Sequence, residues 1–153
     1  MIQLATVITA FTLAAGVASP ITAQSEPVTT STLTPTGLFF CNFTQHGDHV
    51  HISSTAPATA SGHGWWENVD CKATKAVVTV ELQIKKNGKW ATVARGSKTV
   101  GPGGGSSRRA VGRALCTNRT PYRWRSVIDV DLVGTADAGN KLTTPEKVVT
   151  CGV

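Results

Sequence analysis

All four histidines of the chain lie between residues 46 and 63, and three of them fall in the stretch HGDHVH, residues 46–51. Imidazole nitrogens are common ligands of zinc and copper ions. An H-x-H pair on a strand projects both rings from one face, roughly 7 Å apart along the chain. The stretch therefore predicts a metal site built around His49 and His51.

One or two further protein ligands must join that pair to complete a site. The nearby side chains with suitable donor atoms are His46, Asp48 and His63. Gly47 lets the chain bend back toward the pair, and His63 is expected to approach from the next strand. The competing interpretation is a polar strand whose histidines make ordinary hydrogen bonds or face the solvent.

Positive charge is the second feature that could serve binding. The formal net charge is +6, and six of the seven arginines lie between positions 108 and 125. They are Arg108, Arg109, Arg113, Arg119, Arg123 and Arg125. Such a cluster favours anionic partners, whose attraction would be screened by salt. The alternative is a solvated basic face, because Asp129 and Asp131 are expected to share a strand face with Arg123 and Arg125 and to be held ionised by them.

A pair of adjacent tryptophans, Trp65-Trp66, is the third feature. Adjacent residues on a strand point to opposite faces, so one ring packs inward and the other is either exposed or covered. An exposed indole would be a stacking platform for a sugar ring or a base. A loop folded over the ring would explain the pair equally well.

Catalytic signatures are missing from the sequence. There is no G-x-S-x-G, no H-E-x-x-H and no phosphate-binding loop, since GPGGGSS lacks the lysine that such a loop needs. The sequence predicts no catalytic residue and a protein that is not an enzyme.

The segment from Met1 to Ala23 has no charged side chain, an apolar middle and small residues at its end. This composition predicts a signal peptide cleaved after Ala23, and hence a secreted protein. A membrane anchor is the alternative, although Gly16, Pro20 and several threonines weaken it. Residues 24–36 are rich in Ser, Thr and Pro and predict a flexible lead-in to one domain over residues 37–153.

Four cysteines in an exported chain predict two disulfides, because no C-x-x-C spacing suggests a redox or zinc site. Three connectivities are open. We favour Cys41 with Cys71 and Cys116 with Cys151, because neighbours in sequence close the shorter loops.

Apolar residues alternate with polar ones in VVTVELQIKK, residues 77–86, as a strand with one buried face requires. The buried face is predicted to hold Val78, Val80, Leu82 and Ile84. Asn87-Gly88 follows and predicts a tight hairpin into KWATVAR. Burial of both Trp90 and Val93 on that second strand would require a β-bulge between them.

A second alternating segment is YRWRSVIDVDLV, whose predicted inner face holds Tyr122, Trp124, Ser126, Ile128, Val130 and Leu132. We expect it to form a hairpin with RRAVGRALC through TNRTP. HVHISS, HGWWENVDC and EKVVTC are further predicted strands, and TADAGNKLTTP is a predicted polar loop. About seven short strands without a helix predict an all-β antiparallel sandwich.

The unit VTVELQIKKNGKWATVA, with YRWRSVIDV further along the chain, resembles bacterial immunoglobulin-like extracellular domains. The stretch from SGHGWW to LTTP is similar to small, uncharacterised secreted proteins of Gram-positive bacteria. The resemblance implies an immunoglobulin-like β-sandwich and export. It carries over no catalytic residue, because such proteins have no assigned chemistry.

These features predict a secreted, non-enzymatic binding module, whose ligand would be an anionic envelope polymer or a carbohydrate. The first alternative is a secreted protein that binds zinc or copper through HGDHVH, and the second is a small hydrolase or inhibitor. We expect a monomer with no specific nucleic-acid partner, no required cofactor besides such a metal, and no membrane span in the mature form.

Overall fold

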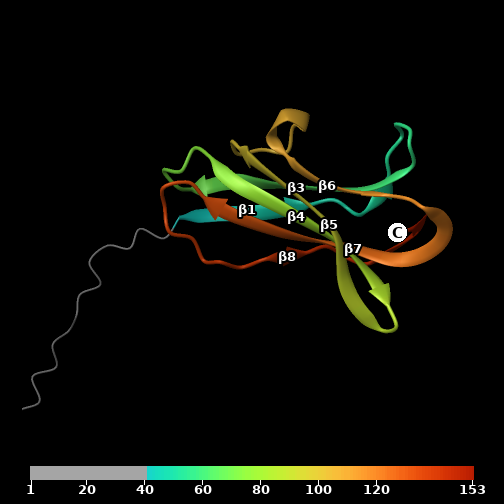
Figure 1. Ribbon diagram of the computed structural model, residues 1–153. Helices are drawn as coiled ribbons and strands as arrows, with labels where there is room; N and C mark the ends of the chain where they lie inside the picture. The colour runs from blue at the N-terminus through green and yellow to red at the C-terminus, as the bar shows by residue number, and fades with distance from the viewer. Residues whose placement is uncertain (1–40) are drawn as a thin grey trace, which may run out of the picture. The chain divides into compact units, whose positions relative to one another are not determined.

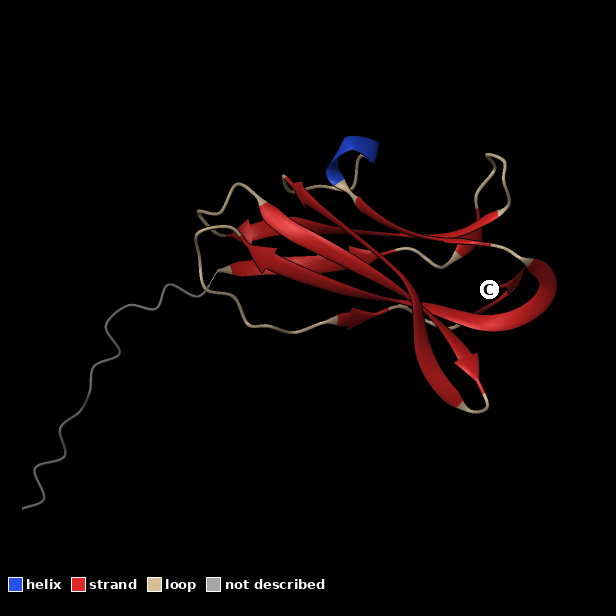
Figure 2. Ribbon diagram, viewed as in Figure 1, coloured by secondary structure: helices blue, strands red, loops and turns tan. Residues whose placement is uncertain are grey.

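The computed structural model describes residues 41–153, which form two antiparallel β-sheets packed face to face (Figures 1 and 2). The β3 sheet contains β1 (Asn42–Gly47), β2 (His51–Ile52), β3 (Thr59–Asp70) and β6 (Ala110–Leu115). The β4 sheet contains β4 (Ala76–Lys86), β5 (Lys89–Val100), β7 (Asn118–Leu132), β8 (Leu142–Thr143) and β9 (Lys147–Gly152). The predicted signal peptide and lead-in lie outside the described residues.

The alternation predicted for β4 is confirmed. Its four inward side chains, Val78, Val80, Leu82 and Ile84, are completely buried. Asn87 and Gly88 both have positive φ, 50° and 77°, which is the geometry of a tight hairpin turn whose twist matches the strands it joins. This hairpin extends beyond the rest of the β4 sheet (Figure 1).

A bulge interrupts β5 at Val93, although the condition attached to its prediction, burial of both Trp90 and Val93, is not met, because both are only half-buried. Leu82 pairs with Ala94 and Gln83 with Thr92, so Val93 is an extra residue without a partner opposite. The bulge shifts the alternation of side chains by one position.

The predicted inner face of β7 is confirmed from Trp124 to Leu132, where every second residue is buried. Its predicted hairpin with β6 was wrong. β6 pairs with β3, from Thr59 opposite Leu115 to Gly64 opposite Ala110, whereas β7 pairs with β4.

The chain leaves one sheet for the other at Cys116 and Thr117. Cys116 N donates a hydrogen bond to Ala58 O (3.0 Å) and Thr117 N donates one to Gly152 O (2.8 Å). The first bond goes to the residue before β3 and the second to β9, so the segment works as a crossover between the sheets rather than a hairpin turn.

Two strands were not predicted, and both lie at sheet edges. β1 was not recognised as a strand, and β8 falls within the predicted polar loop TADAGNKLTTP. β1 and β2 pair with successive parts of β3, and β8 and β9 with successive parts of β7. The nine strands therefore fill about seven strand positions. The chain crosses between the sheets after β3, after β5 and after β6, as in immunoglobulin-like sandwiches.

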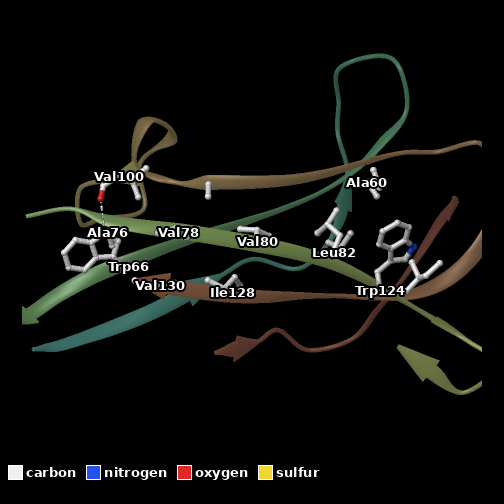
Figure 3. Packing of buried hydrophobic residues seen from close by; sticks show 14 of the residues in the cluster. Ala60, Trp66, Ala76, Val78, Val80, Leu82, Val100, Trp124, Ile128 and Val130 are labelled. Carbon is white, nitrogen blue, oxygen red and sulfur yellow. Dashed lines mark hydrogen bonds between the residues drawn. The ribbon is translucent and has the colours of Figure 1, made fainter. Parts of the chain in front are cut away.

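The core lies between the two sheets, with Trp66 near one end and Trp124 near the other (Figure 3). Between them, the inner face of β3 carries only small residues: Ala60, Gly62 and Gly64. A Cβ atom at Gly64 would lie 2.9 Å from the Val80 side chain and 3.0 Å from that of Ile128. The β4 sheet therefore packs directly on the backbone of β3.

Both predicted disulfides are present, Cys41–Cys71 and Cys116–Cys151. The first joins the start of β1 to the end of β3, and the second joins the crossover to β9. Two disulfides are typical of proteins in an oxidising compartment outside the cytosol. Residues 41–153 contain no helix that is long and apolar enough to cross a membrane.

Candidate metal centre

The centre is created by a bulge between β1 and β2. Gly47 pairs with Gly64 and His51 with Ser61, so three residues of this edge, 48–50, face two residues of β3. Val50 fills the core at 1% exposure. The extra residue brings Asp48 and His51, three apart in sequence, to the outer face of the β3 sheet.

Asp48 binds His63 through both carboxylate oxygens. Oδ1 accepts a hydrogen bond from the backbone N of His63 (2.7 Å), and Oδ2 lies 2.6 Å from its ring Nδ1. A carboxylate can only accept, so Nδ1 carries the proton and Nε2 is left with a free lone pair in the neutral ring. The two contacts fix both the position and the orientation of this imidazole.

A backbone carbonyl orients the His51 ring, and it too engages the Nδ1 side. Its Nδ1 lies 3.1 Å from the carbonyl oxygen of His49, which again requires an Nδ1–H donor and leaves Nε2 free. The rings of His51 and His63 stack with their centroids 5.4 Å apart and an interplanar angle of 24°.

One ligand atom from each of Asp48, His51 and His63 lies within 4.8 Å of the other two, and all three side chains are half-buried. Ligands of one zinc ion are up to about 4 Å apart, so small rotations of the two imidazole rings would bring them to coordination distance. Metal-binding histidines typically donate the second ring N–H to a carboxylate or a backbone carbonyl, and both rings do so in this group.

The other two predicted ligands lie outside the group. His46 stacks on Trp65, with centroids 5.5 Å apart and an interplanar angle of 8°, and its Nε2 is 3.4 Å from Glu67 Oε2. His49 is exposed and contributes its carbonyl oxygen rather than its ring. The expectation that His49 and His51 share a strand face fails because the bulge interrupts the alternation.

The tryptophan pair divides as predicted, with one ring on each face of β3. Trp66 is buried, and its Nε1 donates a hydrogen bond to Val100 O (3.2 Å), drawn as a dashed line in Figure 3. Trp65 is half-buried on the outer face, where His46 stacks on its ring and the loop at Gly104 packs closely against its pyrrole edge. Trp65 is therefore partly covered.

The six clustered arginines are spread over both sides of the molecule. Arg113 lies on the outer face of the β3 sheet, whereas Arg123 and Arg125 lie on the outer face of the β4 sheet. Arg123 pairs with Glu146 (3.1 Å), and Arg125 donates to Gln83 (2.8 Å) and lies 4.2 Å from the centroid of the Trp90 ring.

The remaining arginines lie away from the central parts of these strands. Arg108, in the short 3₁₀ turn Ser106–Arg108, donates to Pro102 O (2.8 Å), and Arg109 follows it in the loop. Arg119 lines an open hollow of about 500 Å³ beside the Cys116–Cys151 disulfide. Proximity in sequence therefore does not produce one continuous basic patch.

The expected pairing of Asp129 and Asp131 with arginines of their own strand is also absent among the contacts of residues 41–153. Asp129 pairs with Lys141 at 2.7 Å. The pKa of Asp131 is raised, first by partial burial and then by the nearby carboxylates of Asp129 and Asp137.

No protein-family model and no curated protein matches this chain, so the resemblance to secreted immunoglobulin-like proteins stays a prediction.

Proposed function

We propose that this protein is a non-enzymatic binding module that holds one transition-metal ion on the outer face of its β3 sheet. His51 and His63 provide Nε2 ligands, and Asp48 orients the His63 ring by accepting its Nδ1–H. One observation supports this proposal: in both rings the Nδ1–H group is already bound to an acceptor, which leaves Nε2 free. The two rings also belong to a group, with Asp48, in which one donor atom of each residue lies within 4.8 Å of the others.

The donor set favours zinc or copper. Imidazole nitrogen suits both ions, whereas calcium and magnesium prefer sites made of oxygen donors. Copper(II) is expected to bind more tightly than zinc, as the general order of divalent-metal affinities predicts. Binding should weaken as the pH falls from 7 to about 5, because protons compete with the metal for imidazole.

The first prediction tests this site by isothermal titration calorimetry of the protein purified without a histidine tag. We expect one equivalent of zinc or copper to bind at pH 7, and a His51→Ala, His63→Ala double variant to lose that binding. His49→Ala is the matched control, because it removes an exposed imidazole from the same segment but keeps the carbonyl that orients His51. Absence of stoichiometric binding, or binding that survives the double variant, would contradict the proposal.

We propose that the protein is secreted and that it binds its ligand outside the cytosol. The two disulfides support it, together with the apolar, uncharged segment from Met1 to Ala23. An anionic polymer or a carbohydrate is less well supported as the principal ligand, because the arginines are dispersed and Trp65 is partly covered.

A further inference from the structure

A row of polar side chains crosses three strands beside the metal centre. His51 on β2 pairs with Ser61 on β3, and Ser61 pairs with Arg113 on β6. Directly opposite residues share a face of the sheet, with Cβ atoms about 5 Å apart. His63 lies two residues from Ser61 on the same strand and the same face. The row therefore runs from the metal centre to a guanidinium group.

Ser61, at the middle of the row, has no hydrogen-bond partner for its hydroxyl. The residue is only 2% exposed, and its Oγ is buried. A buried hydroxyl without a partner is costly, so a water, an ion or a ligand group is expected beside it. On the two neighbouring strands, His51 and Arg113 lie directly opposite Ser61. Ser61 therefore lies between a proposed metal ligand and a guanidinium group that can bind an anion.

Arg113, at the end of the row, is exposed and forms no ion pair or side-chain hydrogen bond within the described part of the chain. This distinguishes it from Arg108, Arg123 and Arg125, each of which already has a partner. A guanidinium fork matches two oxygens of a carboxylate or phosphate.

The metal proposed above would have two protein ligands, His51 and His63. A tetrahedral ion then keeps two positions for further ligands. An oxyanion could place one oxygen on the metal and others on the Arg113 guanidinium, and could accept a hydrogen bond from Ser61 Oγ.

We infer that the metal centre binds a small oxyanion, a carboxylate or a phosphate, between the metal ion and Arg113. This inference rests on the proposed metal-binding function. It assigns Arg113 and Ser61 a role in recognising the ligand and none in holding the metal.

The second prediction is tested with the cobalt(II)-loaded protein, titrated separately with acetate and with inorganic phosphate. We expect saturable shifts of the cobalt absorption bands with at least one of the two anions, because direct coordination changes the ligand field. The anion that binds more tightly identifies the preferred class. The metal-free protein should bind neither anion at the same concentrations.

Two variants separate anion recognition from metal binding. Arg113→Gln should weaken anion binding about tenfold or more, because a charged hydrogen-bond donor is lost, while metal affinity stays within about twofold. Ser61→Ala should weaken anion binding by a smaller factor. Arg123→Gln is the matched control, since that arginine lies on the opposite sheet and pairs with Glu146.

The outcomes distinguish this inference from the proposed function. If metal binds and neither anion shifts the bands, or if Arg113→Gln binds the anion as well as the unmodified protein does, the inference is overturned and the metal site stands. If the protein binds no metal at these histidines, both are overturned.

Discussion

Asp131 shows how a single carboxyl group affects stability through its surroundings. Its pKa is raised first by partial burial and then by Asp129 and Asp137, although Lys141 and Arg95 oppose the shift. An acid with a raised pKa in the folded state holds its proton more tightly there than in the unfolded chain. Its contribution to stability is complete below the unfolded pKa and is lost as the pH rises through the folded value.

The third prediction follows from the raised pKa of Asp131. Asp131→Asn removes the repulsion at neutral pH, so the variant should melt slightly above the unmodified protein at pH 7. The gain should stay within about 0.5 kcal/mol, because the site is on the surface and solvent screens the repulsion. Thermal unfolding at pH 7 and at pH 3 measures it, and the advantage should disappear in acid. A lower melting temperature for the variant at pH 7 would contradict the direction of the shift.

At the residue scale, the sequence indicated which side chains have donor atoms for the candidate centre, but not how they are arranged. Asp48, His51 and His63 were all among the five predicted ligands, because imidazole and carboxylate groups can be read directly from residue types. His46 and His49 could not be separated from them. That distinction depends on one extra residue in the pairing of β1 and β2 with β3, and no local composition marks where such a bulge falls.

At the scale of elements, the middle of β3 is held close to the β4 sheet by its glycines. A methyl group at Gly64 would approach the side chains of Val80 and Ile128 to about 3 Å. Both of those residues are completely buried, so neither can move away freely.

The fourth prediction is that Gly64→Ala destabilises the protein by roughly 1 to 3 kcal/mol, the usual cost of overpacking a core. Chemical denaturation measures the change. Gly105→Ala is the control, because a Cβ atom at Gly105 meets nothing within 4 Å. Equal stability of the two variants would show that the sheets can separate at β3 at little cost.

Elements whose signals are local were predictable, and pairings between distant segments were not. The β4–β5 hairpin follows from alternation and an Asn-Gly turn, both contained in one continuous segment between Ala76 and Val100. The partner of β6 is set by the crossover at Cys116, where backbone hydrogen bonds go to Ala58 and Gly152, far away in sequence. The short edge strand β8 has only two residues, too few for any alternation to be visible.

At the scale of the whole molecule, the two disulfides close loops with sequence separations of 30 and 35 residues. Loop closure of this length is expected to contribute about 3 to 4 kcal/mol per bridge by restricting the unfolded chain.

The fifth prediction is that reduction, or replacement of either cysteine pair by serine, lowers the melting temperature substantially. Calorimetry with and without reductant measures the effect. Thiol titration of the native protein should find no reactive thiol before reduction. Two or more titratable thiols in the native protein would contradict the disulfide assignment.

The placement of the two disulfides also determines how the protein responds to a pulling force. A load applied at Cys41 and Cys151 passes through the Cys41–Cys71 bond, along residues 71–116, and through the Cys116–Cys151 bond. The two closed loops are shielded from tension, and only the segment between the bridges can lengthen. At about 3.4 Å per residue, its fully stretched length is on the order of 150 Å. His51, His63 and Asp48, which orients His63, all lie within the first shielded loop. Force can therefore unravel β4, β5 and β6 while the two proposed metal ligands stay tethered to one another.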